Sequence, residues 1–312
     1  MKNIALVTGG TGYLGKNLTR KLLDSGWEVH LLVRDATKAD DQKFYLNGST
    51  THFYDGNINN LISVLELSRP TVVFHLAAKV VTDHKFENVA IVEEIYDSNI
   101  LFGSQLLEAM RICSIKKFVN TGTFWQYYES DEYNPVSLYA ASKQAFEAIL
   151  KYYVNAENYE VITLTLFDNY GPLDTRPKLF SMLNKLALSN SPVEMSGGEQ
   201  YINIVYIDDV AQAYLTAGLI LIEETGSKYN NYVVSSPSQI KLRDLVEIYL
   251  ELAPIKPKIL WGARTYRDRE VMQPWSSGVR LPGWHPQVDL RQGIAKILPI
   301  LNSPIEIKNS GK

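Results

Sequence analysis

Val7-Thr8-Gly9-Gly10-Thr11-Gly12-Tyr13-Leu14-Gly15 is a glycine-rich segment that directly follows the apolar run 4–7. An apolar strand, a turn with closely spaced glycines and a helix would together place backbone N–H groups against a pyrophosphate. Gly9 would form the tight turn, Gly12 would let the backbone approach the phosphates, and Gly15 would let the helix pack against the strand. The pattern T-G-x-x-G-x-x-G therefore predicts a dinucleotide site.

Length and composition exclude several classes of protein. The 312 residues predict one large domain with a smaller second lobe, and the net charge of -3 offers no basic surface for nucleic acid. The single cysteine, Cys113, excludes an internal disulfide framework, and the five scattered histidines predict no metal site. The start has no signal-peptide pattern, and no apolar run reaches the roughly 20 residues that span a bilayer. We therefore expect a cytoplasmic protein without a membrane partner.

Strand and helix patterns alternate through the first half of the chain. Apolar strands are predicted at 29–33, 72–78 and 118–120, and a long helical pattern fills 89–113. Strands that are apolar on both faces are typical of a parallel sheet covered by helices on both sides. The sequence therefore predicts an α/β fold, a doubly wound parallel (Rossmann) sheet whose ligands lie outside the carboxyl ends of the strands.

The residue just past the second predicted strand meets the adenosine ribose of the dinucleotide in such folds. Here it is Arg34. An acidic residue at this position would prefer NAD, whereas an arginine can pair with the 2′-phosphate of NADP. Arg34 favours NADP(H), and the alternative that it is an ordinary solvated residue, with NAD(H) as cofactor, stays open.

Tyr139 and Lys143 lie four residues apart at the start of a helix predicted to end near residue 156. This spacing places both side chains on one helix face. An ammonium beside a phenol is expected to lower the phenol's pKa, so that the tyrosine can exchange a proton with a hydroxyl or carbonyl oxygen. Thr123, at the end of a strand shortly upstream, and the N-terminal glycine turn make a chance match improbable.

These motifs resemble those of the extended short-chain dehydrogenases/reductases, the family of nucleotide-sugar epimerases, dehydratases and reductases. The resemblance covers most of the chain and adds H-x-A-A at 75–78, Y-G-P at 170–172, and a glycine-rich segment at 197–200 leading to I-D-D-V at 207–210. It implies a dinucleotide-binding domain over residues 1–166. Residues 167–312 would form mainly a smaller substrate-binding α/β lobe, with segments that return to the large domain. It also implies a nucleotide-sugar substrate and a homodimer.

The resemblance also assigns site residues. Tyr139 would exchange a proton with the sugar oxygen, Thr123 would donate a hydrogen bond to that oxygen, and Lys143 would hold the nicotinamide ribose. The expected cofactor contacts are Gly9, Thr11, Gly12, Tyr13, Leu14, Gly15, Arg34, Asp55, Gly56, Leu76, Ala77, Ala78, Asn99, Tyr139 and Lys143. The expected substrate contacts are Lys79, Thr123, Phe124, Trp125, Asn169, Arg176 and Arg267.

Arg267 begins the segment R-D-R-E-V, which resembles the family's R-P-G-D-V segment, whose arginine grips the substrate pyrophosphate. A guanidinium suits phosphate because it donates two parallel hydrogen bonds. Arg176 and Lys178 are weaker candidates, for which an ordinary surface charge is about as good an explanation.

Two departures from the family patterns bear on the reaction. Dehydratases follow the catalytic threonine with Asp-Glu, whereas Thr123 is followed by Phe124-Trp125, although Glu129 and Asp131 lie a few residues further on. The 4-epimerases keep an Arg-Asp pair where this chain has Ile202-Asn203. The first departure disfavours dehydration, and the second disfavours 4-epimerisation.

We therefore predict NADP(H)-dependent reduction of a keto group on a nucleotide-linked deoxysugar, with C4 as the favoured position. The chain is similar to the 4-ketoreductases that make CDP-linked 3,6-dideoxyhexoses, so that a CDP-linked substrate is favoured. An NAD-dependent nucleotide-sugar 4-epimerase is the alternative. A binding protein that senses a dinucleotide without turnover is disfavoured, because it would not need an intact Thr123, Tyr139 and Lys143.

Overall fold

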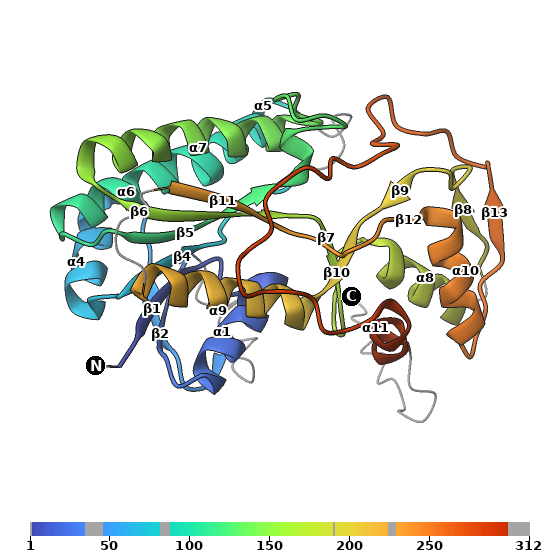
Figure 1. Cartoon of the computed structure of the whole chain (residues 1–312), viewed down its shortest axis with the longest axis horizontal. Helices are drawn as coiled ribbons and strands as arrows, with labels where there is room; N and C mark the ends of the chain where they lie inside the picture. Colours follow the sequence, from blue (N-terminus) through green and yellow to red (C-terminus); the bar gives the residue numbers. More distant parts are fainter. Residues whose placement is uncertain (1, 35–45, 82–87, 190, 224–228, 299–312) are drawn as a thin grey trace, which may run out of the picture.

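A seven-stranded parallel sheet forms the centre of the protein in the computed structural model, which describes residues 2–34, 46–81, 88–189, 191–223 and 229–298 (Figure 1). The strand order is β11-β6-β5-β4-β1-β2-β3. The bounds are β1 (Ile4–Thr8), β2 (Glu28–Val33), β3 (Thr50–Phe53), β4 (Val72–His75), β5 (Lys117–Thr123), β6 (Glu160–Leu166) and β11 (Tyr229–Val234). The order reverses direction between β1 and β4, which confirms the predicted doubly wound Rossmann sheet.

Helices cover both faces of this sheet (Figure 1). On one face, α1 (Tyr13–Asp24) and α9 (Ile207–Glu223) pack over a core that includes Leu18 and Leu22. The other face carries the layer that includes Leu61, Leu106 and Phe146. The helices of that layer are α4 (Ile58–Ser68), α6 (Phe102–Ile112) and α7 (Leu138–Glu157), with α5 (Val89–Tyr96) near them. The inner strands β1, β2, β4, β5 and β6 are almost entirely buried, as their apolar runs predict, whereas the edge strand β3 is mostly exposed.

The long helical pattern at 89–113 is not one regular helix. A π-helical turn, Asp97–Leu101, separates α5 from α6 and contains Asn99. The apolar repeat in the sequence does not reveal this π-helical turn, because the turn is a single wider one that leaves the helical run unbroken. Such turns are rare and often occur at functional sites.

A second layer of structure lies beyond the carboxyl ends of the large sheet (Figure 1). Its own core contains Phe180, Leu183, Leu245, Tyr249 and Ile294. Its helices are α8 (Leu179–Leu188), α10 (Leu242–Leu252) and α11 (Leu290–Ile297). Its three strand pairs are β7 (Asp168–Tyr170) with β10 (Ile204–Tyr206), β8 (Val193–Met195) with β13 (Ile259–Trp261), and β9 (Tyr201–Ile202) with β12 (Ile240–Lys241).

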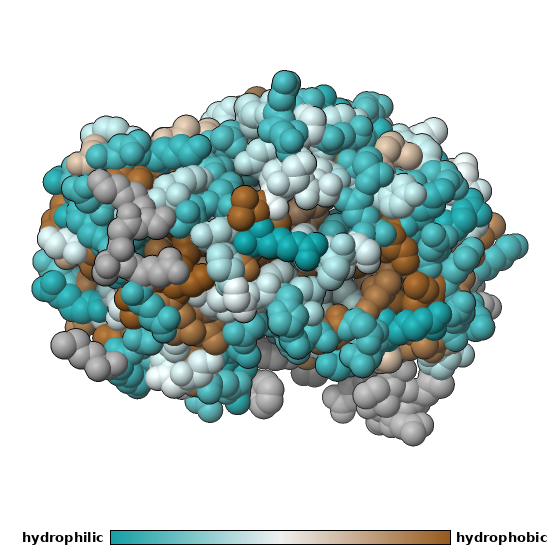
Figure 2. Space-filling model, viewed as in Figure 1, coloured by the Kyte–Doolittle hydropathy of each residue, from teal (hydrophilic) through white to brown (hydrophobic). Residues whose placement is uncertain are grey.

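The chain crosses between the two parts more than once. β6 ends at Leu166, yet α9 and β11 return to the large sheet, where β11 pairs with β6. A division at residue 166, with returning segments, remains our proposal for the domains. Across the described ranges, no helix is both long and apolar enough to cross a membrane. Figure 2 shows hydrophilic residues over most of one face, with hydrophobic residues in separate patches.

Candidate active site

The glycine turn joins β1 to α1 through contacts that only glycine permits. Gly9 has a φ of +72°, and a Cβ there would lie 2.7 Å from the Ala77 backbone nitrogen. A Cβ at Gly15 would overlap with the Gly9 carbonyl oxygen. The N-cap of α1 is Gly12, which offers no side-chain cap, and the first turn contains no acidic residue. The first N–H groups of α1 are thus suited to an anion, and the turn fits a dinucleotide pyrophosphate.

Arg34, which is predicted to meet the adenosine ribose, lies at the same sheet edge as the predicted cofactor contacts Asp55 and Gly56. In the parallel register Thr8 pairs with Leu32, and Arg34 follows β2 with an exposed side chain. Asp55 and Gly56 follow the neighbouring strand β3, and Gly56 has a φ of +92°. The sheet therefore brings Arg34, Asp55 and Gly56 to the edge that carries the glycine turn.

Thr123 ends β5 and is buried. Its backbone N–H donates to Gln126 Oε1 at 2.9 Å, and its hydroxyl oxygen accepts from the Trp125 N–H at 3.4 Å. These bonds close the short 3-10 turn Phe124–Gln126 directly after the strand. β5 and β6 are in register so that Thr123 pairs with Leu166.

α7 begins where the Ser137 hydroxyl oxygen accepts from the Ala140 N–H at 3.3 Å, and it carries Tyr139 and Lys143 one turn apart. Tyr139 is partly exposed, whereas Lys143 is 2% exposed. No other described residue forms a hydrogen bond or ion pair with the Lys143 ammonium. A buried ammonium is then available to the hydroxyls of a ribose.

The expectation that Lys143 lowers the pKa of Tyr139 is wrong. Burial raises the pKa of Tyr139 to about 12, and burial also lowers the pKa of Lys143 to about 8, an effect that the Glu147 carboxylate partly offsets. Desolvation disfavours each charged form, and it alone sets the direction of the shift at Tyr139. Tyr139 is therefore a protonated phenol at neutral pH.

Asn99 links the loop after β4 to α7. Its side-chain oxygen accepts from the Lys79 N–H at 2.7 Å, and its amide donates to the Lys79 carbonyl at 3.0 Å and to Ser142 Oγ at 2.9 Å. The Ser142 hydroxyl in turn donates to the Tyr139 carbonyl at 2.7 Å. Asn99 thus holds the loop of Leu76, Ala77 and Ala78 beside α7, and the π-helical turn aims its side chain at both.

His75 of the H-x-A-A motif connects the loop after β4 to the neighbouring strand β1. Its ring is buried among Phe102, Phe118 and Phe146, and burial, aided by Lys143, lowers its pKa to about 3. Its Nδ1 lies 2.9 Å from the Thr8 hydroxyl, which also accepts from the Ala77 N–H at 3.2 Å. A neutral His75 therefore joins β1 to the loop after β4.

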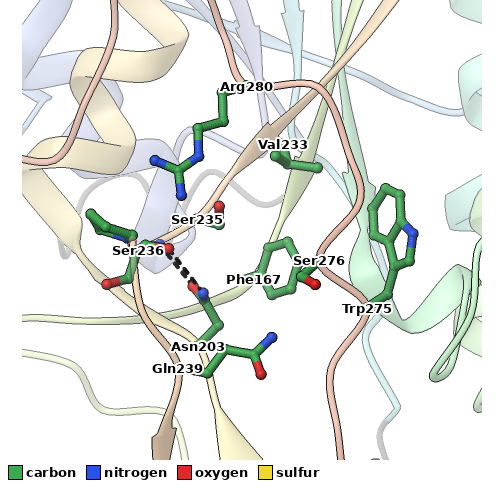
Figure 3. Close-up of a pocket in the computed structure, with 10 residues that line it drawn as sticks. Phe167, Asn203, Val233, Ser235, Ser236, Gln239, Trp275, Ser276 and Arg280 are labelled. Atoms are coloured by element: carbon green, nitrogen blue, oxygen red, sulfur yellow. Dashed lines mark hydrogen bonds between the residues drawn. The ribbon is translucent and has the colours of Figure 1, made fainter.

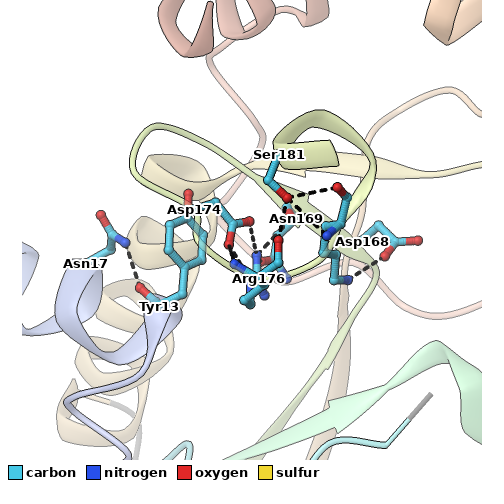
Figure 4. A network of polar contacts seen from close by, with 8 residues as sticks. Tyr13, Asn17, Asp168, Asn169, Asp174, Arg176 and Ser181 are labelled. Carbon is cyan, nitrogen blue, oxygen red and sulfur yellow. Dashed lines mark hydrogen bonds and ion pairs between the residues drawn. The ribbon is translucent and has the colours of Figure 1, made fainter. Parts of the chain in front are cut away.

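Arg176 lies beside the cofactor turn (Figure 4). Its guanidinium stacks over the Tyr13 ring, 4.3 Å from the ring centre, and donates to Asp174 Oδ2 at 2.7 Å and Asn169 Oδ1 at 2.8 Å. Lys178, the neighbouring candidate, pairs with Asp168 at 2.9 Å. The structure thus brings Asn169 and Arg176 together, across the start of α1.

The other predicted substrate contacts lie on separate segments of the chain. The Lys79 ammonium pairs with Glu94. Phe124 is buried and stacks on Phe167, with ring centres 4.8 Å apart, while Trp125 is partly exposed. Arg267 lies on the segment after β13, where its guanidinium is exposed and 3.8 Å from Glu270.

A pocket of about 280 Å³ lies at the carboxyl ends of β6 and β11 (Figure 3). Phe167 directly follows β6, whose last residue pairs with Thr123, so the pocket lies one strand away from Thr123. Figure 3 shows Arg280 pointing toward Ser235 and Ser236. The lining residues are Phe167, Asn203, Val233, Ser235, Ser236, Pro237, Gln239, Trp275, Ser276 and Arg280.

Sequence reasoning gave neither Arg280 nor Trp275 a part in the site. Trp275 stacks on Tyr127, with ring centres 4.2 Å apart, and forms a wall of the pocket. No other described side chain forms a hydrogen bond or ion pair with the Arg280 guanidinium. No local motif marks either residue, because the fold alone brings them to the ends of β6 and β11.

The two carboxylates that follow Thr123 are engaged in structural contacts. Glu129 accepts from the backbone N–H groups of Met272 at 2.6 Å and Gln273 at 3.2 Å. Asp131 accepts from the Trp275 indole N–H. Both hold the segment that forms one wall of the pocket. Among the described residues, no cluster of three or more His, Cys, Asp or Glu side chains could hold a metal ion.

Known proteins are similar to this chain over most of its length. Residues 5–234 match the model of the NAD dependent epimerase/dehydratase family. CDP-abequose synthases of Salmonella muenchen and Salmonella typhimurium are 27% and 28% identical over 297 and 308 residues, covering 94% and 96% of this chain and 96% and 98% of those proteins. The crystal structure of a Thermus thermophilus UDP-glucose 4-epimerase complex with NAD superposes with a TM-score of 0.77 at 25% identity, covering 94% of this chain and 97% of that one. Because the family model spans most of its length, this chain belongs to the NAD dependent epimerase/dehydratase family, the extended short-chain dehydrogenases/reductases.

Proposed function

We propose that this protein reduces the C4 keto group of a CDP-linked deoxysugar with NADPH. The observation that carries the proposal is the set of Thr123, Tyr139 and Lys143 at one sheet edge, with a phenol that is protonated at neutral pH. Reduction of a ketone needs a proton donor at the oxygen, and Tyr139 supplies it. The CDP-abequose synthases among its relatives support a CDP-linked sugar as the substrate.

The neighbouring side chains disfavour the other reactions of the family. Phe124 and Trp125 follow Thr123 and transfer no protons, while Glu129 is held by backbone N–H groups. Dehydration therefore lacks its acid and base. Ile202 stands where the 4-epimerases of this family keep an arginine, which removes one phosphate clamp of that pattern.

The cofactor site assigns a task to several residues. The glycine turn and the start of α1 would bind the pyrophosphate, and Arg34 would pair with the 2′-phosphate of NADP. The Lys143 ammonium would donate to the nicotinamide ribose. When bound, NADPH supplies the hydride for the carbonyl carbon. Thr123 would hold the carbonyl oxygen while Tyr139 transfers its proton to that oxygen.

The proposal is tested by incubating the purified protein with a CDP-linked 4-keto-6-deoxyhexose and either NADPH or NADH. We expect loss of reduced cofactor in equal amount to the alcohol formed, with NADPH preferred. NAD+ that stays bound in equal amount through purification, together with epimerisation of a UDP-sugar, would instead support the 4-epimerase. That second candidate is favoured by the likeness to the Thermus thermophilus enzyme.

The pH dependence of turnover follows from the two shifted groups. Lys143 has its pKa lowered to about 8, so its charged form is lost as the pH rises through that value, while Tyr139 stays protonated up to about 12. We expect kcat to fall with increasing pH on the alkaline side of neutrality. A kcat that rises through the same range would indicate that the phenolate is the active form.

Arg280 offers a positive charge to the substrate diphosphate in the pocket beside Thr123. Arg280→Leu should raise the KM for the nucleotide sugar by about tenfold to hundredfold and leave kcat nearly unchanged, because a charge-assisted hydrogen bond is worth about 1.5–3 kcal/mol. Arg267→Leu tests the other proposed clamp. Arg291→Leu, which removes a surface ion pair with Glu251, is the control. An unchanged KM in Arg280→Leu would remove the pocket from substrate binding.

We also propose that two chains associate through the helices α5, α6 and α7. Val89 and Tyr96 of α5, Ile112 of α6 and Tyr152 of α7 are exposed large hydrophobic residues. Burial of such side chains favours association. Sedimentation velocity should give the mass of a dimer.

A further inference from the structure

Glu147 is a buried carboxylate on the catalytic helix α7, one turn after Lys143. Glu147 is only 3% exposed. In the ranges that the structure describes, no lysine, arginine or histidine nitrogen lies within ion-pair distance of it. A buried charge without an ion-pair partner is costly unless hydrogen bonds compensate it, so its surroundings must supply donors.

Three donors from two other elements surround the carboxylate. Gln126 Nε2 donates to Oε2 at 2.9 Å, and Asn231 Nδ2 donates to Oε1 at 3.2 Å. The Tyr229 hydroxyl also donates to Oε1. Tyr229 and Asn231 belong to β11, which is separated from β5 by β6. Glu147 therefore connects α7 and β11 to the turn that follows Thr123.

Gln126 transmits this connection to the catalytic threonine. Its Oε1 accepts from the Thr123 backbone N–H at 2.9 Å, while its Nε2 donates to Glu147 and to Gln144 Oε1 at 2.6 Å. A carboxylate only accepts hydrogen bonds. If the amide of Gln126 turned over, its oxygen would face Glu147 and its NH₂ would face the Thr123 N–H. The carboxylate thus fixes the amide orientation that holds Thr123.

The same carboxylate acts on Lys143 through its charge. Burial lowers the pKa of Lys143, whereas the charge of the Glu147 carboxylate raises it. Among the described residues, the other titratable groups near the pair are His75, whose pKa is lowered to about 3, and the phenols of Tyr127, Tyr139 and Tyr229, whose pKa values burial raises. These groups are neutral at neutral pH, so Glu147 is the negative charge that balances the Lys143 ammonium.

We propose that Glu147 is a positioning residue that orients Thr123 through Gln126 and keeps the Lys143 ammonium charged. This inference rests on the proposed function, because Thr123 and Lys143 are the groups that act in that reaction. One buried side chain, Glu147, would thus connect Thr123, which donates a hydrogen bond to the substrate oxygen, with Lys143, which holds the ribose.

Two variants separate the two effects. Glu147→Gln keeps the size and removes the charge, so kcat should fall about tenfold to hundredfold and the alkaline decline in kcat should move to lower pH. Gln126→Met breaks the link to Thr123 and leaves the charge, so kcat should fall without movement of the pH profile. Glu147→Asp should restore the pH profile. Glu157→Gln, at the partly exposed C-terminal end of α7, is the matched control and should change neither kcat nor its pH profile.

Hydrogen exchange at the Thr123 amide provides a readout that needs no turnover. The exchange should become at least about tenfold faster in Glu147→Gln and in Gln126→Met, at unchanged circular dichroism, and stay unchanged in Glu157→Gln. Unchanged exchange in both variants, or a kcat loss in Glu147→Gln that is uniform across pH, would overturn the inference. If the wild type does not reduce the keto sugar, the proposed function fails. Exchange at the Thr123 amide, together with an NMR titration of the Lys143 ammonium in the wild type and in Glu147→Gln, would then still decide whether Glu147 controls both residues.

Discussion

Tyr139→Phe should lower kcat by a factor of about 10² to 10⁴ and leave dinucleotide affinity nearly unchanged. The phenyl ring fills the same space, and no hydrogen bond joins the Tyr139 hydroxyl to another described residue, so the fold of α7 should persist. Only the proton donor is lost. Turnover with the keto sugar and calorimetric titration with NADPH measure the two quantities.

Tyr133→Phe is the matched control, because Tyr133 lies on the loop before the same helix with 52% of its surface exposed. It should behave as wild type in both measurements. A kcat of Tyr139→Phe within about twofold of the wild-type value would remove Tyr139 from the mechanism.

Gly15→Ala should largely abolish dinucleotide binding. The added Cβ would overlap with the Gly9 carbonyl oxygen and lie 2.7 Å from Gly10 Cα, and backbone atoms cannot move aside as a flexible side chain does. The turn must shift, which misplaces its N–H groups and should cost about 1–3 kcal/mol of folding stability. NADPH titration and thermal unfolding report the two effects.

Gly10→Ala provides the comparison within the same turn. Its Cβ would meet only the end of the flexible Leu31 side chain, at 2.8 Å. Most of the affinity should therefore remain. Equal losses in Gly10→Ala and Gly15→Ala would mean that close helix packing at Gly15 is not what shapes the phosphate site.

Features set by local spacing were predictable from the sequence. The glycine turn at residues 9–15 lies between β1 and α1, as its pattern predicts, and Tyr139 and Lys143 lie one turn apart on α7. Alternating apolar strands and helices predicted the doubly wound sheet, and the parallel register then carries Arg34 and Thr123 to one edge. Each of these features depends on residues close together in the chain.

Features that depend on distant segments were not predictable. The pKa of Tyr139 is raised by burial, which no four-residue spacing reveals. The partners of Glu147 on β11, Tyr229 and Asn231, come from 82 and 84 residues further along the chain. Arg280 reaches the pocket only because its segment crosses the ends of β6 and β11. Tertiary packing determines all of these properties.

Hydride transfer to the sugar is the central claim, and isotope labelling tests it most directly. The protein would be given a CDP-linked 4-keto-6-deoxyhexose and NADPH that carries deuterium at its transferable position. We expect a product with one deuterium on the former carbonyl carbon, detected by mass spectrometry and NMR. A sugar product without deuterium, or an epimerised sugar formed with no net consumption of NADPH, would contradict the account.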